Sequence, residues 1–383
     1  MNLAVKKSLE YVSFDGYIDF GDYRYLSCNF FNGLIRQSKE DGVIDACAFP
    51  EGPVFSQLLH HRVFMNGSEL VFSPDYSYGV HTFDLNSNKM NYYVVKKDEW
   101  ENYRCSCSHV WNNKLWMFLA YGENGIVSMD LETHNIEYYP DAYKTIRKYV
   151  EPGEVVFWSE LCINDGCVYG VINNKNYIVQ INLEDISVKI IELEMELHLS
   201  GITINNSYLY MTEYNTNDIL IYDIQKKTIK RLDFPFHNLM THENGLMYSN
   251  IVSGGGIVLA VHNYLKSIFE ITTEEIKQYG DFPDEQEDIN TDLRRTYRRF
   301  YSTLYDDNKI ELYPARSNMM ISIDISKKKI TGNKLKLPSN WIKHGYGKII
   351  GDYFEECSKY NVPITESDLC DINDFINYLD GDN

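Results

Sequence analysis

The sequence predicts an all-β fold in which one four-stranded sheet is repeated along the chain. Apolar and polar residues alternate over short runs, and the runs are separated by turns rich in Asn, Asp and Ser. The same pattern then recurs every 41 to 54 residues. Since one four-stranded meander cannot bury both of its faces, the copies are expected to pack on one another.

The clearest copy lies at the centre of the chain, in Ser200–Leu232. It predicts four strands at residues 200–204, 208–213, 219–224 and 228–232. The intervening turns hold Asn, Asp, Ser and Lys, and no part of the segment has a helical period. This copy therefore defines the repeat against which the rest of the chain is compared.

The third strand of each copy carries a marker, an apolar run that ends in an acid or an amide. A polar turn and a short apolar strand follow each marker, and a hairpin precedes it. The six markers end at Asp84, Asp130, Asn182, Asp223, Glu270 and Asp324. A weaker seventh copy covers residues 9–50, with its fourth strand expected at Val43–Phe49.

Four strands per unit and a period in the forties are typical of a β-propeller. The repeats resemble the broad β-propeller superfamily, in the style of quinoprotein-like and kelch-like blades. They lack the Trp-Asp pair of WD40 units and, in nearly every copy, the doubled glycine of kelch units, so no specific family is indicated. We expect a seven-bladed propeller over residues 8–338, with six blades as the alternative.

Two segments depart from the strand pattern. Residues 339–383 contain two stretches with helical spacing, and they are predicted to form a short α-helical appendage that packs on the propeller or docks another protein. Asp141–Glu154, between two repeats, is predicted to form one or two helical turns before Pro152. Connections of this length in a repeat protein are often functional.

Composition narrows the class of protein. The chain has 383 residues, 44% hydrophobic residues, 31 Tyr and a net charge of −19, so it is acidic and tyrosine-rich. A strongly acidic surface argues against binding to nucleic acid or to anionic membranes. The first residues lack the apolar run of a signal peptide, and the eight cysteines are scattered. We therefore expect a cytoplasmic protein with reduced cysteines.

The resemblance implies a ligand site, because the first strand of each propeller blade lines the central channel and most ligands bind where these strands begin. At these positions the chain carries histidines, carboxylates, arginines and large aromatic side chains, which suit a sugar, a peptide or an anionic molecule. The candidate ligand-binding residues are His60, Trp158, Glu160, His198, Tyr248, Arg298, Arg299 and Tyr301.

Two local motifs have alternative explanations. Arg294, Arg295, Arg298 and Arg299 form a cluster that would hold an anion or an acidic peptide, or would pair internally with Asp284–Asp288. Cys105, Cys107 and His109 alternate on one strand, which spreads them over roughly 13 Å. Ligands of one zinc ion lie about 2.3 Å from the metal, so no metal and no other cofactor is predicted.

These observations favour a binding or scaffold protein that holds a peptide, a protein partner or a small ligand at the central face. The alternative is a propeller lyase or hydrolase that acts on a glycan or a peptide. Its acid–base pair would be a histidine and a carboxylate at the channel mouth, such as His60 with Glu160. The choice between these classes depends on analogy, because one fold serves both.

Overall fold

The computed structural model describes residues 16–27, 33–40, 44–48, 60–98, 103–120, 125–151, 153–157, 161–239, 245–283, 300–306, 308–314 and 319–334. The predicted appendage at 339–383 lies outside these residues. The described strands form seven four-stranded antiparallel sheets, and the fold class is that of a seven-bladed β-propeller. The prediction of seven blades is therefore confirmed, and the alternative of six is wrong.

Each blade is a meander whose four strands follow one another in chain order. Blade 1 contains β1 (Tyr17–Phe20), β2 (Tyr23–Ser27), β3 (Gly33–Ser38) and β4 (Ile44–Ala48), and blade 2 contains β5 (His60–Asn66), β6 (Glu69–Pro74), β7 (Gly79–Asp84) and β8 (Lys89–Val94). Blade 3 contains β9 (Cys105–Trp111), β10 (Lys114–Leu119), β11 (Ile126–Asp130) and β12 (Ile136–Tyr138), and blade 4 contains β13 (Cys162–Asn164), β14 (Cys167–Val171), β15 (Tyr177–Asn182) and β16 (Val188–Glu192). Blade 5 contains β17 (Leu199–Asn205), β18 (Tyr208–Glu213), β19 (Ile219–Asp223) and β20 (Thr228–Leu232), blade 6 contains β21 (Tyr248–Gly254), β22 (Ile257–His262), β23 (Ser267–Ile271) and β24 (Ile276–Asp281), and blade 7 contains β25 (Phe300–Asp306), β26 (Lys309–Pro314), β27 (Met319–Asp324) and β28 (Lys329–Lys334).

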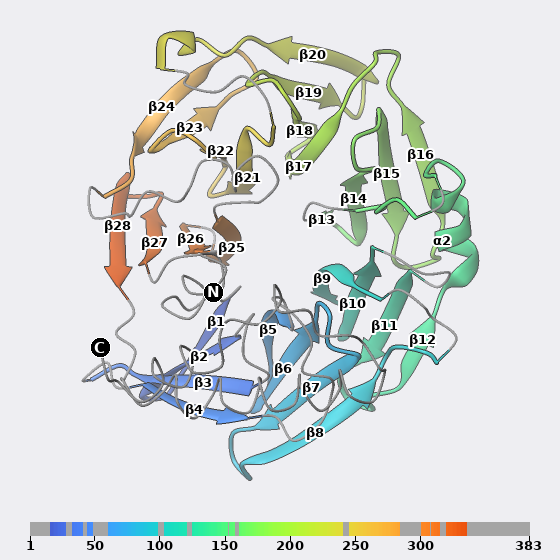
Figure 1. Cartoon of the computed structure of the whole chain (residues 1–383), viewed down its shortest axis with the longest axis vertical. Helices are drawn as coiled ribbons and strands as arrows, with labels where there is room; N and C mark the ends of the chain where they lie inside the picture. The colour runs from blue at the N-terminus through green and yellow to red at the C-terminus, as the bar shows by residue number, and fades with distance from the viewer. Residues whose placement is uncertain are drawn as a thin grey trace, which may run out of the picture. The chain divides into compact units, whose positions relative to one another are not determined.

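The chain divides into two compact units. One contains blades 1 and 2, and the other contains blades 3 to 7. Within the larger unit the first strands β9, β13, β17, β21 and β25 lie on the inner side, and the fourth strands lie on the outer side (Figure 1).

The hydrophobic core is distributed between successive blades. One buried cluster joins blades 4 and 5 through residues such as Val171 and Leu220, and another joins blades 5 and 6 through Ile221 and Phe269. Blades 6 and 7 share a third cluster, and blades 1 and 2 share one in the smaller unit. Within each unit, neighbouring sheets therefore bury their facing sides against one another, as the repeat pattern predicts.

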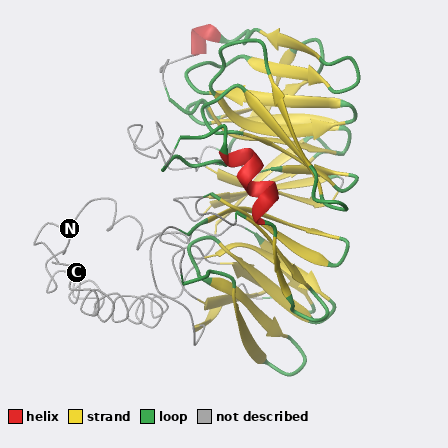
Figure 2. Cartoon of the chain, turned by 90° about the vertical axis from the view of Figure 1, so that its right-hand side faces the viewer, coloured by secondary structure: helices red, strands yellow, loops and turns green. Residues whose placement is uncertain are grey.

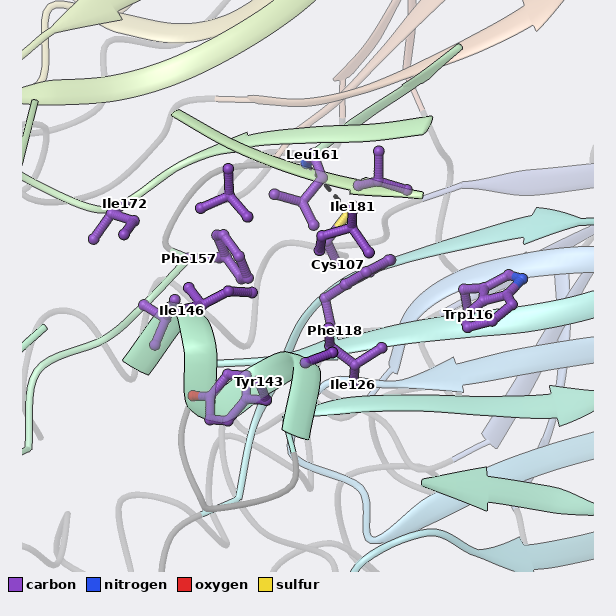
Figure 3. Close-up of a cluster of buried hydrophobic side chains, with 14 of the residues drawn as sticks. Cys107, Trp116, Phe118, Ile126, Tyr143, Ile146, Phe157, Leu161, Ile172 and Ile181 are labelled. Atoms are coloured by element: carbon purple, nitrogen blue, oxygen red, sulfur yellow. Dashed lines mark hydrogen bonds between the residues drawn. The ribbon is translucent and has the colours of Figure 1, made fainter. Parts of the chain in front are cut away.

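A helix reinforces the contact between blades 3 and 4. α2 (Pro140–Arg147) begins one residue before the predicted connection at 141–154, with proline in its first turn and Arg147 in its last. Its Tyr143 and Ile146 are fully buried in the cluster that contains Phe118, Phe157 and their neighbours (Figure 3). α2 and the short helix η1 (His237–Leu239) lie at the same end of the strands (Figure 2).

That end is called the connection face below, because the chain passes there from one blade to the next. The opposite end, where the first strand turns into the second and the third into the fourth, is called the turn face. In blade 5, for example, β17 begins and β18 ends at the connection face, since Leu199 pairs with Glu213. The turns at 206–207 and 225–227 lie at the turn face.

The acidic markers have a local structural role at the turn face. Asp84, Asp130, Asp223 and Asp324 each accept a backbone N–H from the residue three positions later in the turn between the third and fourth strands. These hydrogen bonds hold the pKa of the Asp84, Asp130 and Asp223 carboxyls below its ordinary value. For Asp324 the side-chain bonds from Lys327 and Ser326 lower the carboxyl pKa most, and the backbone N–H of Lys327 adds to them. The acid therefore recurs because it closes a turn, and its recurrence says nothing about a ligand.

A β-bulge recurs where the first strand begins. In blades 3, 5 and 6 one extra residue is inserted opposite the second strand, at Ser106, Ser200 and Ser249. All three serines are buried. Ser200 Oγ lies 3.0 Å from Thr212 Oγ1, and Ser249 Oγ donates to Asn263 Oδ1 at 2.7 Å. The bulges turn the strand and fix the direction of the side chains at the connection face.

Among the described residues, no helix has the length and apolar character needed to cross a membrane.

Candidate functional site

The described part of the connection face contains a polar network across blades 4, 5 and 6. It lies in the larger unit and includes two of the residues predicted from the sequence, His198 and Tyr248. The network has three parts: a group of charged side chains in blade 5, a set of exposed polar side chains above it, and a buried histidine in blade 6.

The charged group surrounds Glu213, the last residue of β18. Its side chain is only 6% exposed, and its Oε2 lies 2.8 Å from Nη2 of Arg231 on β20. The other end of the Arg231 guanidinium lies 3.4 Å from Asp218 Oδ2, and Asp218 Oδ1 accepts the Phe234 N–H at 3.0 Å. One arginine therefore neutralises two carboxylates and links β18, β20 and the loop before β19 at the connection face.

Exposed polar side chains lie around this group. The backbone N–H of His198 contacts Glu213 Oε1 at 3.4 Å, and its imidazole Nδ1 lies 3.0 Å from Asn174 Oδ1. The Tyr214 hydroxyl donates to Asn173 Oδ1 at 3.1 Å. With the amide of Asn174 in this orientation, Nδ1 of His198 carries the proton and Nε2 is an acceptor. His198 thus presents an exposed imidazole, oriented by Asn174, next to the charged group around Glu213.

Blade 6 contributes a buried histidine that the sequence analysis did not select. Nδ1 of His262 accepts the backbone N–H groups of Tyr264 and Leu265, at 3.1 and 3.0 Å. Nε2 therefore carries the proton and donates to Asn217 Oδ1 at 2.8 Å. The Tyr248 hydroxyl donates to the carbonyl oxygen of the same Asn217. The Asn217 turn of blade 5 is consequently bound to blade 6.

Tyr248 and His198 differ in what they offer to a ligand. Tyr248 is buried, its hydroxyl is engaged by Asn217, and burial together with the nearby Asp218 raises the pKa of its phenol. It serves as a support for the connection face. His198 is exposed at the surface of the same face. Of the two, only His198 presents a side chain that a ligand can contact.

His60 lies in the smaller unit, at the start of β5. It is fully buried, with its ring centroid 5.2 Å from the His81 ring and 6.1 Å from the Phe72 ring. Burial, and secondarily the neighbouring His81, lowers the pKa of His60 well below its ordinary value. His60 is therefore neutral in the folded protein, and its surroundings are aromatic. The adjacent His61 is buried as well, next to an irregularity in the pairing of β5 with β6.

Of the other predicted residues, the described part of the chain contains only Tyr301. Tyr301 lies on β25, where it pairs with Tyr313. The remaining candidates, Trp158, Glu160, Arg298 and Arg299, lie outside the described residues, as does the whole cluster Arg294–Arg299. The hypothetical pair of His60 with Glu160 therefore stays a prediction.

The Cys105–His109 motif packs against blade 4. Cys107 Sγ accepts the Leu161 N–H at 3.4 Å and lies 3.4 Å from His109 Nε2, which donates to the Leu161 carbonyl oxygen at 2.9 Å. Burial raises the pKa of the neighbouring Cys162 thiol, so this thiol stays protonated. Within the described residues no three His, Cys, Asp or Glu side chains form a group that could hold a metal ion.

Comparison with known proteins supports the fold without indicating an activity. No protein-family model and no curated protein matches the sequence. Among solved structures, the chain is similar to a virginiamycin B lyase from Staphylococcus aureus, a catalytically inactive histidine-to-alanine variant with quinupristin. The identity is 14% over 82% of this chain and 94% of that chain, with a TM-score of 0.56.

Two further solved structures are similar at comparable levels. One is BamB from Moraxella catarrhalis, at 10% identity over 82% of this chain and 85% of that chain, with a TM-score of 0.52. The other is the computationally designed Ika8 protein, at 8% identity over 85% and 87% of the two chains, also with a TM-score of 0.52. A lyase, BamB and a designed protein share this fold, so the similarity establishes architecture alone.

Proposed function

We propose that this protein is a binding protein, and that the connection face of blades 4 to 6 holds a segment of a partner protein. The observation that carries the proposal is the polar network itself. The exposed imidazole of His198 is bonded to the exposed Asn174, and the backbone N–H of His198 contacts Glu213, whose carboxylate pairs with Arg231. Groups that are ordered in advance lose little conformational entropy when a partner binds.

The charged group around Glu213 is suited to holding neighbouring residues in place and poorly suited to acid–base catalysis. Arg231 engages the carboxylates of both Glu213 and Asp218, and the amide N–H of His198 contacts the remaining oxygen of Glu213. A general base needs an oxygen available to the substrate. Glu213 therefore acts in the proposal as a positioning residue for the backbone of His198. The proposal also includes a cytoplasmic location, as expected from the sequence.

A photo-crosslinking experiment tests the proposal. A benzoyl-phenylalanine introduced at Asn215, which is exposed on the connection face, is expected to form an adduct with one main partner in native host extract. The same probe at Glu184, exposed on the turn face of blade 4, is the matched control. The adduct should weaken when His198 and Asn174 are both changed to Ala. An equal adduct at Glu184, or none at Asn215, would contradict the proposal.

The lyase alternative has one observation in its favour, which is the fold shared with the virginiamycin B lyase. In this chain its proton acceptor would be Nε2 of His198, the exposed imidazole whose Nδ1 is bound to Asn174. Incubation of the protein with quinupristin, followed by chromatography, tests this alternative directly. Loss of intact quinupristin that disappears in His198→Gln would favour the lyase over the binding protein.

A further inference from the structure

His262 is a buried titratable group that joins blade 6 to blade 5 beneath the proposed binding site. It is the last residue of β22, where it pairs with Tyr248. The last residue of β18 in blade 5 is Glu213, whose charge is neutralised by Arg231. Blade 6 therefore has an imidazole at the strand position where blade 5 has a paired carboxylate, and the protonation state of this imidazole affects how the two blades are joined.

The hydrogen bonds of His262 require a neutral ring. Its Nδ1 accepts the backbone N–H groups of Tyr264 and Leu265, at 3.1 and 3.0 Å, so this nitrogen cannot carry a proton in the closed turn. Its Nε2 donates to Asn217 Oδ1 at 2.8 Å and joins the 262–265 turn to the loop before β19. These three bonds are called the His262 lock below. A proton on Nδ1 would face two N–H donors and would break the first two bonds.

The surroundings of the ring disfavour a positive charge. His262 is fully buried, and the ring centroids of Phe234, Tyr248 and Phe269 lie 5.9, 5.2 and 6.1 Å from its own. Aromatic faces attract a cation less strongly than burial away from water disfavours it. An imidazolium is therefore costly for as long as the lock is closed.

The described charged groups near the lock do not offset this cost. Asp218, in the loop before β19, already pairs with Arg231. Lys266 directly follows the 262–265 turn and is exposed, and its positive charge opposes an imidazolium. His237 of η1 is also exposed and adds a second imidazole at the same end of the strands. With these groups around it, the buried ring takes up a proton more readily when the turn is open.

The loop that the lock holds also supports the proposed binding site. Asp218, the residue after Asn217, pairs with Arg231, and Arg231 pairs with Glu213. Glu213 in turn contacts the backbone N–H of His198. Release of the loop would therefore loosen the groups that hold His198 in place.

We propose that the His262 lock makes the connection face sensitive to acid. When Nδ1 takes up a proton, the 262–265 turn and the loop before β19 separate, and the groups around His198 lose the arrangement that a partner binds. Only this last step rests on the proposed function, since the lock opens without a partner. The closed form is fully stabilised above the titration range of a free imidazole, and this stabilisation is lost as the pH falls through that range.

Native-state hydrogen exchange at the Tyr264 and Leu265 amides tests the lock. The imidazole of the open form titrates at the ordinary value of a free histidine, about 6.5. Protection should therefore fall about 30-fold between pH 7.5 and pH 5.0, after correction for the intrinsic exchange rate. Low concentrations of urea should leave these rates unchanged, because separation of two turns exposes little surface. A strong urea dependence would mean that the amides exchange by global unfolding, and it would overturn the proposal.

Two variants isolate the contribution of the ring. His262→Gln removes the buried imidazole, and the matched control His237→Gln removes an exposed one from the same unit. The pH-dependent loss of protection should shrink to less than about threefold in His262→Gln and persist in His237→Gln. An equal loss in His262→Gln and in the wild-type chain would overturn the proposal.

Nitrogen-15 NMR of the wild-type ring gives a measurement that does not depend on the folding of a variant. It should show the neutral form of His262, with the proton on Nε2, from pH 7.5 down to pH 6.0. A ring that is half protonated near pH 6.5, with the Tyr264 and Leu265 amides still protected, would overturn the proposal.

The benzoyl-phenylalanine probe at Asn215 tests the step that rests on the proposed function. Its adduct should weaken in step with the open fraction that hydrogen exchange gives at the same pH, and this pH dependence should be absent in His262→Gln. An adduct that keeps its strength while the lock opens would overturn the regulation of the site. A missing adduct at pH 7.5 would refute the proposed function and this last step with it, whereas the exchange result would still decide whether the lock exists.

Discussion

Removal of the Arg231 guanidinium should destabilise the larger unit, because it leaves the buried carboxylate of Glu213 without its counter-ion. Loss of one partner of a fully buried ion pair costs about 3–5 kcal/mol, whereas an exposed pair contributes about 0–1 kcal/mol. Glu213 is 6% exposed and Arg231 is 32% exposed, so the pair lies between these limits. We expect Arg231→Met to lower the free energy of unfolding by about 2–3 kcal/mol.

The assay is urea unfolding, with the double variant Glu213→Gln/Arg231→Met measured beside the single one. The double variant should recover about half of the loss, because a neutral amide is far less costly to bury than an unpaired carboxylate. Lys114→Met is the control, since Lys114 pairs with the largely exposed Glu137, and it should cost less than about 1 kcal/mol. A cost below 1 kcal/mol for Arg231→Met, or no recovery in the double variant, would refute the reasoning.

Three further predictions concern packing and pH. Gly170→Ala should lower stability by about 1–3 kcal/mol in urea unfolding, because a Cβ there would lie 2.3 Å from Leu161 Cδ2 in the core between blades 3 and 4; an unchanged midpoint would show that this core relaxes freely. Phe118→Ala, in the same core, should cost about 3–5 kcal/mol and shift the denaturation midpoint accordingly, whereas a loss below 1 kcal/mol would be inconsistent with its full burial. The lowered pKa of His60 means that its contribution to stability is complete above the unfolded-state value of 6.5 and is lost as the pH falls below that value. The slope is at most about 1.4 kcal/mol per pH unit, and His60→Gln should flatten it in urea titrations between pH 7 and pH 5; an unaltered slope would contradict the assignment.

The architecture was predictable because each blade is specified by local signals. Alternating apolar residues define the strands, and the acids at Asp84, Asp130, Asp223 and Asp324 mark turns whose backbone N–H groups they accept. The sequence also predicted one or two helical turns before Pro152, and α2 (Pro140–Arg147) forms there. The prediction for Val43–Phe49 is close to the observed β4 at Ile44–Ala48.

The site was predictable only to the extent that strand starts could be located. That rule selected His198 and Tyr248, which lie on the connection face and whose role in binding stays a prediction, and it missed Glu213, Arg231 and His262, which lie at or next to the ends of second and fourth strands. Their partners come from positions 13 to 45 residues away, and no local pattern specifies such pairs. One signal was available in the sequence, because the alternating run of β18 ends in the charged residue Glu213. Charged residues are unusual at buried positions, and Glu213 is buried.

The turns between third and fourth strands are held within their own blade. In each of the four acid-closed hairpins the aspartate accepts a backbone N–H from three residues later, and the residue after the aspartate donates its N–H to the turn between the first and second strands of the same blade. A fluorophore attached to an exposed side chain of such a turn, for example that of Glu132, should therefore be tolerated while the far side keeps its geometry. The molecule thus offers attachment points for labels on one side and leaves the other side undisturbed for capture studies.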